Sequence, residues 1–144
     1  MARILALDIG ERRIGVAVSD ETATVAQPLM VIAREGTAKD VERITQIARQ
    51  YAAHEVVVGL PVTLRGEQAQ AVQKVQAFVA HLRRALDVPI VLVDERLSTA
   101  EANRRMREAD VGRGARRQKV DAVAAALILE KYLSQRSAKG NRYA

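Results

Sequence analysis

Apolar residues near the N-terminus fall into short runs that predict three β-strands. Residues 3–9 are predicted to form a buried strand, residues 10–13 a turn, and residues 14–20 and 27–33 two further strands. The connections between these strands are short, and short connections favour antiparallel pairing. The first third of the chain is therefore predicted to form an antiparallel meander.

The middle of the chain alternates helical spacing with two more apolar runs. Thr37 is predicted to cap a helix whose apolar residues recur every three or four positions, and the same spacing from Glu67 to Leu86 predicts a second amphipathic helix. The runs EVVVGLP and VPIVLVDE predict two buried strands, one after each of these helices.

Two more helices are predicted towards the C-terminus. Ser98 and Glu101 form a capping box that opens the first, and the second is predicted to begin near Val120. Strands separated by helices imply parallel pairing through crossovers. We therefore expect an α/β fold with a mixed five-stranded sheet, its first three strands antiparallel, and helices on both faces. One domain is expected over residues 1–135, followed by a basic, disordered tail, residues 136–144.

Composition narrows the setting of the protein. The chain has 144 residues, of which 49% are hydrophobic, enough for one core. It has no cysteine, which excludes disulfides, thiolate metal sites and cysteine nucleophiles and suits a reducing cytosol. No secretory apolar region follows Met1, and the longest apolar run, residues 122–129, is too short to span a bilayer. We expect a soluble cytoplasmic protein that does not associate with a membrane.

The charge distribution indicates an anionic partner. The formal net charge is +6, and seven basic residues lie between Arg104 and Lys119 against two acids, Glu108 and Asp110. A solvated basic face would also account for such a cluster. Only 3% of the residues are aromatic, which disfavours a surface that stacks unpaired bases. If nucleic acid binds, we expect contacts with phosphates and helix shape.

Several common catalytic motifs are absent from the sequence. It contains neither a GxxxxGK[ST] phosphate loop nor a GxGxxG turn after a strand. His54 and His81 are its only histidines, and both are predicted to lie in helices or at helix ends, as surface or capping residues. No HExxH motif or serine nucleophile elbow is present.

Acidic residues at the ends of buried segments remain to be explained. Asp8 ends the first strand, Asp94 and Glu95 end the last, and Asp121 begins the final helix. Alternation along a strand sends Asp94 and Glu95 to opposite faces of the sheet, and the pattern does not choose between them. Each acid has a local explanation: a turn at Asp8, a helix-cap partner at Glu95, a first-turn acid at Asp121.

Taken together in a basic chain, these acids favour a metal site. Carboxylates that converge repel one another unless a cation neutralises them. Hard oxygen ligands suit Mg²⁺ or Mn²⁺, and two such ions can clamp the attacking water and the leaving oxygen of a phosphodiester. The pattern thus predicts that a metal ion compensates the charge of Asp8.

Four ordered blocks then resemble a known family along nearly the whole chain: LALDIGERRIGVAVSD, VVVGLPVTLRGEQA, VDERLSTAEA and KVDAVAAALILEKYL. They resemble the YqgF (RuvX) family of the ribonuclease H-like superfamily, which is related to the RuvC-type Holliday junction resolvases. The resemblance implies a ribonuclease H-like fold, βββαβαβα with one extra short helix. Carried over by position, the acidic triad of the family falls on Asp8, Glu95 and Asp121, so the resemblance selects Glu95 over Asp94.

The same resemblance implies a metal-dependent nuclease that hydrolyses phosphodiesters in structured nucleic acid. The family is associated with 5′-end maturation of pre-16S rRNA, and its older assignment is Holliday junction resolution on branched DNA, which would require a homodimer. Mg²⁺ or Mn²⁺ would be held by Asp8, Glu95 and Asp121. The residues expected to contact phosphates are Arg96, Arg104, Arg105, Arg113, Arg116, Arg117 and Lys119.

One departure from the family and two alternatives complete the prediction. Family members often carry an asparagine and an Asp-Gly pair after GLP, whereas residues 62–66 here are VTLRG, so substrate preference is expected to differ. A nucleic-acid-binding module with structural carboxylates would bind in a salt-dependent way without cleaving. The first block also resembles a phosphate loop of actin-like ATPases, but 144 residues are too few for their two domains.

Overall fold

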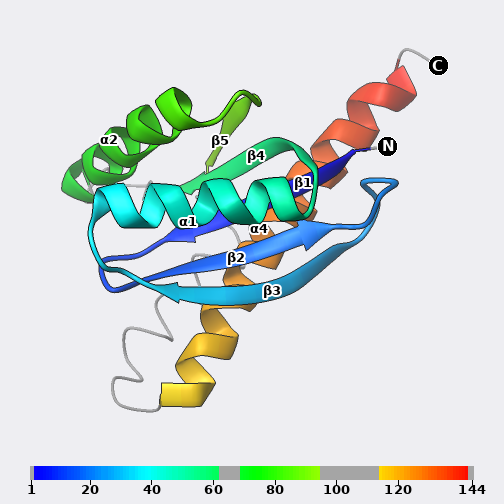
Figure 1. Cartoon of the computed structure of the whole chain (residues 1–144). Coiled ribbons are helices and arrows are strands. Elements are labelled where there is room, and N and C mark those ends of the chain that lie inside the picture. The colour runs from blue at the N-terminus through cyan, green and yellow to red at the C-terminus, as the bar shows by residue number, and fades with distance from the viewer. Residues whose placement is uncertain (1, 62–68, 95–113, 143–144) are drawn as a thin grey trace.

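The computed structural model describes residues 2–61, 69–94 and 114–142. Five strands and three helices lie within these ranges, and Figure 1 shows their arrangement. In chain order they are β1 (Arg3–Ile9), β2 (Arg13–Ser19), β3 (Ala26–Ala33), α1 (Thr37–Gln50), β4 (Ala53–Leu60), α2 (Ala69–Ala85), β5 (Ile90–Asp94) and α4 (Gly114–Arg142).

The strands form one mixed sheet in the order β3-β2-β1-β4-β5. β1 and β2 pair antiparallel, as do β2 and β3, whereas β4 runs parallel to β1 and β5 parallel to β4. The predicted fold class is therefore confirmed, including the antiparallel pairing of the first three strands. β1, at the centre of the sheet, is hydrogen-bonded on both sides.

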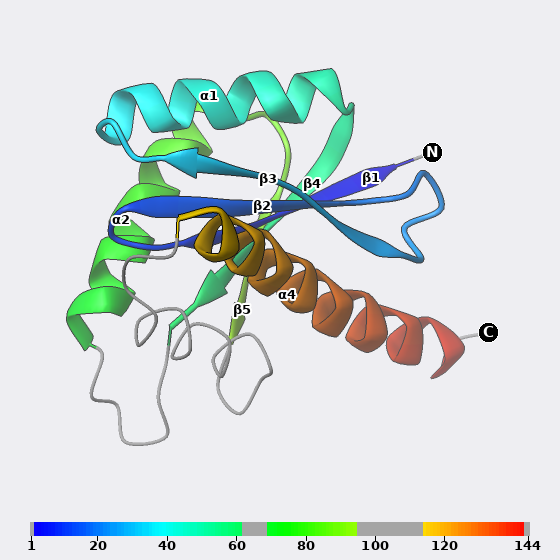
Figure 2. The ribbon, with the colours of Figure 1, turned by 90° about the horizontal axis from the view of Figure 1, so that it is seen from below.

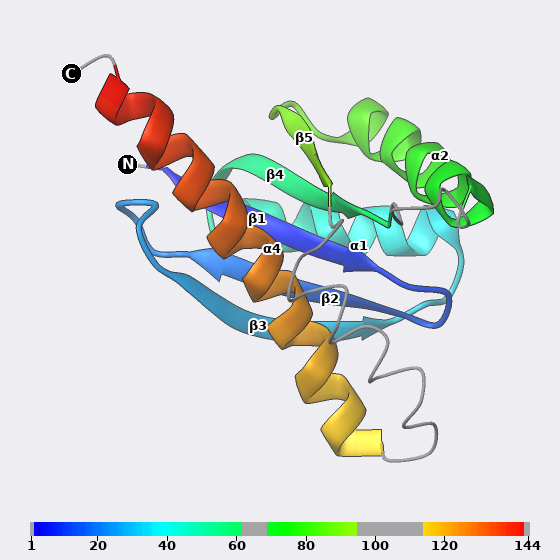
Figure 3. The ribbon, with the colours of Figure 1, turned by 180° about the vertical axis from the view of Figure 1, so that it is seen from behind.

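Helices cover both faces of the sheet. α1 and α2 pack on one face, and α4 runs diagonally across β1, β2 and β3 on the other (Figures 2 and 3). Residues of β1 alternate between these layers: Leu5 and Leu7 join the core under α1 and α2, and Ile4 and Ala6 join the core under α4. The next residue in the second series is Asp8, so its side chain faces α4.

The structure corrects two predicted helix starts. The N-cap of α1 is Gly36, with Thr37 as the first helical residue and no side-chain cap. Gly36 has a φ of 131°, a backbone conformation open to glycine but strained for threonine. α4 begins at Gly114, six residues before the predicted start at Val120, because its apolar pattern marks where it packs on the sheet rather than where helical backbone begins.

Three further predictions differ from the structure or lie outside it. α4 continues through Arg142, so the backbone of residues 136–142, part of the predicted tail, is helical. His54 lies in β4, not in or beside a helix as predicted. The capping box at Ser98 lies outside the described residues. No helix in the described part of the chain is long and apolar enough to cross a membrane.

Candidate active site

Asp8 lies near the end of the central strand and is almost completely buried. Its exposed fraction is 2%, and it is paired in register with Gly15 of β2. Directly opposed residues in an antiparallel pair point their side chains to the same face and have Cα atoms about 5 Å apart. Both Asp8 and Gly15 therefore face α4, and the predicted turn does not account for Asp8, which lies within the strand pairing.

The backbone of α4 packs directly against Gly15, and this contact brings Asp121 to the site. A Cβ atom on Gly15 would lie 2.0 Å from the carbonyl oxygen of Asp121 and 2.6 Å from its carbonyl carbon. Only a residue without a Cβ allows so close an approach. Asp121 is 3% exposed. Asp8 and Asp121, from opposite ends of the chain, thus lie beside the same glycine on the same face.

The position of Asp121 in its helix excludes the local explanation for its charge. α4 begins at Gly114, so Asp121 lies about two turns into the helix. The favourable effect of a helix N-terminus on an acid is confined to about the first turn. The buried carboxylate of Asp121 is therefore not explained by the helix dipole.

Arg13, the first residue of β2, contacts Asp121 from the strand. Its Nε donates a hydrogen bond to Oδ2 of Asp121 at 2.7 Å, and the exposed fractions of the two side chains are 21% and 4%. The pair joins β2 to α4 across the site. A charge-assisted hydrogen bond of this length fixes the orientation of the carboxylate.

A second arginine holds the turn between β1 and β2 in place. Arg34 donates to the carbonyl oxygen of Gly10 at 3.1 Å and to Oδ2 of the buried Asp40 at 3.1 Å. Its guanidinium also lies 5.1 Å from the ring centre of Phe78 on α2. Arg34 therefore ties the turn that follows Asp8 to α1 and α2, which keeps the end of β1 in a fixed position.

The third predicted acid and most of the predicted phosphate contacts fall outside the described residues. These are Glu95, Arg96, Arg104, Arg105 and Arg113. The backbone of Arg116, Arg117 and Lys119 lies in the first turns of α4, but their side chains are not described. In the ranges that the structure covers, no three Asp, Glu, His or Cys side chains gather into a metal site.

Asp94, the alternative to Glu95, is the last residue of β5. Val93 belongs to the core under α4, the face shared by Asp8 and Asp121. Alternation along the strand therefore turns Asp94 to the opposite face. Its carbonyl oxygen accepts a hydrogen bond from Lys131 of α4. The geometry thus separates the side chain of Asp94 from the pair formed by Asp8 and Asp121.

Two residues of the site escaped the sequence prediction. Arg13 was assigned to a turn, and Gly15 was an unremarked position in a strand. The signal present in the sequence is their alternation, since residues 13 and 15 share one face of β2 and meet the same helix residue. The donor set of Asp8 and Asp121, two buried carboxylates on one face, fits a hard divalent cation.

Comparisons with known proteins agree with this architecture. RuvC from T. thermophilus, in complex with Holliday junction substrate, superposes with a TM-score of 0.59 at 19% identity, covering 94% of this chain and 96% of that one. The fowlpox virus Holliday junction resolvase superposes with a TM-score of 0.52 at 14% identity, covering 92% of this chain and 98% of the other. At these identities the likeness establishes the ribonuclease H-like fold.

Sequence relatives are closer. A protein of Desulforudis audaxviator named "Putative pre-16S rRNA nuclease" is 47% identical over 139 residues, which cover 96% of this chain and 99% of the relative. A protein of the same name from Thermoanaerobacter pseudethanolicus is 46% identical over 138 residues, 95% of this chain and 99% of the relative. The family model described as "RuvX: Holliday junction resolvase" matches residues 2–135. The chain therefore belongs to the RuvX family.

Proposed function

We propose that this protein is a divalent-metal-dependent nuclease whose catalytic and metal-ligating residues are Asp8, Glu95 and Asp121. The observation that carries the proposal is the placement of two buried acidic residues, from distant parts of the chain, beside Gly15 on one face of the sheet. Isolated buried charges are costly, and two carboxylates at one place raise that cost. Arg13 supplies one positive charge at Asp121, and the two carboxylates offer the hard oxygen ligands that suit Mg²⁺ or Mn²⁺.

Glu95 is the third acid in this proposal, and Asp94 is not. The face occupied by Val93 is the face of Asp8, so alternation along β5 turns Asp94 away from that face. This argument from the strand agrees with the choice that the family motif implies. It also makes Asp94 a matched control for Glu95, since the two acids are adjacent in the chain.

Each of these residues would have a separate role, which its side chain determines. Asp8 and Asp121 would hold the cation with their carboxylate oxygens, and Glu95 would ligate or orient it. When bound, divalent ions activate the attacking water and neutralise the charge that develops on the leaving oxygen. Arg13 orients the carboxylate of Asp121. The basic residues from Arg96 to Lys119 would hold the flanking phosphates.

The proposed substrate is pre-16S rRNA, cut during maturation of its 5′ end. Support comes from the names of the relatives, which are 46% and 47% identical over nearly the whole chain. The net charge of +6 suits an RNA backbone. Resolution of a Holliday junction is the second candidate function, because the matching family model carries that description. Two symmetric cuts would then require a two-fold dimer.

A cleavage assay with Mn²⁺, run on pre-16S rRNA and on a four-way DNA junction, tests these proposals. We expect cleavage of the RNA by the wild type and a loss of at least about 100-fold in Asp8→Asn, Glu95→Gln and Asp121→Asn, since even outer-shell partners of metal ligands cost 10- to 100-fold. Asp94→Asn should retain activity. Circular dichroism establishes that each variant is folded.

Two results would contradict the proposals. Full cleavage by folded Asp121→Asn would remove Asp121 from the mechanism and contradict the proposed metal site. Symmetric cutting of the junction by a dimer, without cleavage of the RNA, would replace the ribosomal substrate by branched DNA. Sedimentation of the wild type with each substrate measures whether a dimer forms.

A further inference from the structure

Arg13 occupies one oxygen of a carboxylate that the proposed function assigns to a metal ion. Its Nε lies 2.7 Å from Oδ2 of Asp121, and the carboxylate side chain is 4% exposed. Water therefore screens the pair weakly on the side of Asp121. A divalent cation that binds Asp121 meets a guanidinium already held there.

The Arg13 guanidinium and a metal ion bound to Asp121 would repel each other. A guanidinium hydrogen-bonded to a carboxylate lies only a few ångströms from any metal ion on the same group, and at that separation in a partly buried site like charges repel strongly. The coupling is reciprocal: the metal weakens the ion pair between Arg13 and Asp121 to the extent that the ion pair weakens metal binding. Arg13 thus raises the metal concentration that the site requires for half-saturation.

The side chain of Arg13 is also placed where it could contact a phosphate of the substrate. Its side chain is 21% exposed, at the first residue of β2 and beside the turn that follows Asp8. Guanidinium groups bind phosphate oxygens through the same donors that they offer to carboxylates. An arginine released from Asp121 would lie at the mouth of the site, where a phosphodiester must approach.

We propose that Arg13 competes with the divalent cation for Asp121, and that on metal binding its guanidinium leaves Oδ2 and contacts a phosphate of the substrate. Arg13 is then a positioning residue for Asp121 in the metal-free protein and a phosphate ligand in the loaded one. Metal and nucleic acid each favour the binding of the other through this side chain. The inference rests on the proposed function, because it requires Asp121 to bind the metal.

Direct titration with Mn²⁺ alone, followed by calorimetry or by the electron paramagnetic resonance of free Mn²⁺, tests the competition without any substrate. We expect Arg13→Gln to bind Mn²⁺ about tenfold more tightly than the wild type, because one opposing charge is gone. Arg13→Lys, which keeps the charge, should remain near the wild-type affinity. In cleavage assays Arg13→Gln should need less Mn²⁺ for half-maximal rate but show a higher KM for nucleic acid.

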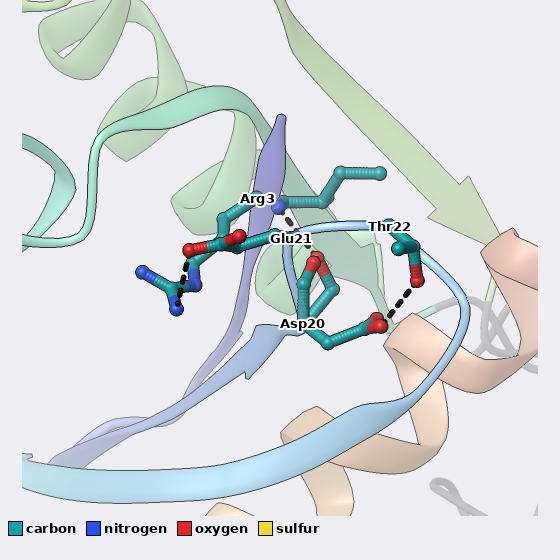
Figure 4. Close-up of polar contacts among 6 residues, drawn as sticks. Arg3, Asp20, Glu21 and Thr22 are labelled. Carbon is teal, nitrogen blue, oxygen red and sulfur yellow. Dashed lines mark hydrogen bonds and ion pairs between the residues drawn. The ribbon is translucent and has the colours of Figure 1, made fainter. Parts of the chain in front are cut away.

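Arg3→Gln is the matched control. Arg3 also lies on a central strand and forms an ion pair, with Glu21 at 3.6 Å, but it begins β1 at the end opposite Asp8 (Figure 4). The substitution removes the same charge from the chain. Its Mn²⁺ affinity should equal that of the wild type, which separates a local effect of Arg13 from the change in net charge.

A measurement on the wild type covers the case in which Arg13→Gln does not fold. The NMR resonance of the Arg13 Nε–H, assigned from its loss in Arg13→Lys, should shift as Mg²⁺ is added, while that of Arg3 stays in place. An unchanged Arg13 resonance at saturating Mg²⁺, or unchanged or weaker Mn²⁺ binding by Arg13→Gln, overturns the inference. Unchanged Mn²⁺ binding by Asp121→Asn overturns the proposed function itself, so the two failures are distinguishable.

Discussion

Carboxylates at the two ends of the β1–β2 pair have opposite surroundings. At one end, Asp8 and Asp121 are buried, and a guanidinium from β2 holds Asp121. At the other end, Asp20 lies in the loop after β2 and accepts a hydrogen bond from the Thr22 hydroxyl (Figure 4). Its carboxylate also accepts hydrogen bonds from the backbone amides of Thr24 and Val25. The surroundings of Asp8 and Asp121 are built from distant parts of the chain, whereas those of Asp20 are built from its neighbours in sequence.

This difference bears on which acids the proposed function uses. The donors to the Asp20 carboxylate, the Thr22 hydroxyl and the amides of Thr24 and Val25, all lie in the loop itself. The role of Asp20 is therefore to shape this loop. The burial of Asp8 and Asp121 is imposed by the sheet and by α4, and Asp121 is held by Arg13 from a distant part of the chain. Under the proposed function, this buried charge serves to bind a cation.

The largest effect is expected from breaking the close approach at the buried end. In Gly15→Ala the new Cβ would lie 2.0 Å from the Asp121 carbonyl oxygen, so α4 must move away from β2. Overpacking of this kind costs about 1–3 kcal/mol or more, and a displacement of about 1 Å at a catalytic group can cost about 100-fold in rate. Urea unfolding and the cleavage assay measure the two losses.

Gly36→Ala provides the contrast for that substitution. No atom lies within 4 Å of a Cβ placed on Gly36, but its φ of 131° strains an alanine. This variant should lose stability through its backbone alone and keep the cleavage rate per folded molecule. If Gly15→Ala behaves in the same way, with an intact rate, the approach of α4 to Gly15 does not position Asp121.

The contrast between the two ends also explains what the sequence could predict. The limits of β1, residues 3–9, follow from a local apolar run and are the same in the structure. Asp8 and Asp121 stood out because each interrupts or opens an apolar segment. The ion pair of Arg13 and the contact of Gly15 depend on where α4 crosses the sheet, which no local pattern specifies.

An intermediate effect is expected at the far end of the α4 face, where Tyr132 lies. Burial and the hydrogen bond and charge of Glu55 raise the pKa of Tyr132 from 10.0 to about 12. A raised pKa in the folded state means that the unfolded chain loses its proton first, so stability falls as pH rises from 10 to 12. In Tyr132→Phe this part of the fall should disappear, by about 1 kcal/mol because solvent screens the partly exposed phenol.

Glu55→Gln sharpens the same test. Oε1 of Glu55 is buried without a hydrogen-bond partner among the described groups, and the amide variant keeps the shape while removing the charge. The pKa of Tyr132, obtained from the tyrosinate absorbance of each protein with and without Tyr132→Phe, should fall. An unchanged pKa would assign the shift to burial alone and remove Glu55 from the account.

The smallest effect is expected in the loop, where Asp20→Asn removes a charge that local donors stabilise. The Thr22 hydroxyl and the Val25 and Thr24 amides hold the pKa of Asp20 well below its ordinary value of 3.8. Protons therefore bind the unfolded chain first as pH falls through about 4, and the stabilising effect of the carboxylate is lost below that pH. Asp20→Asn should flatten this acid limb in urea unfolding curves, Thr22→Val should reproduce part of the change, and neither should alter cleavage. A loss of cleavage in folded Asp20→Asn would mean that the two ends of the sheet are coupled, and the division between a chemical end and a structural end would not hold.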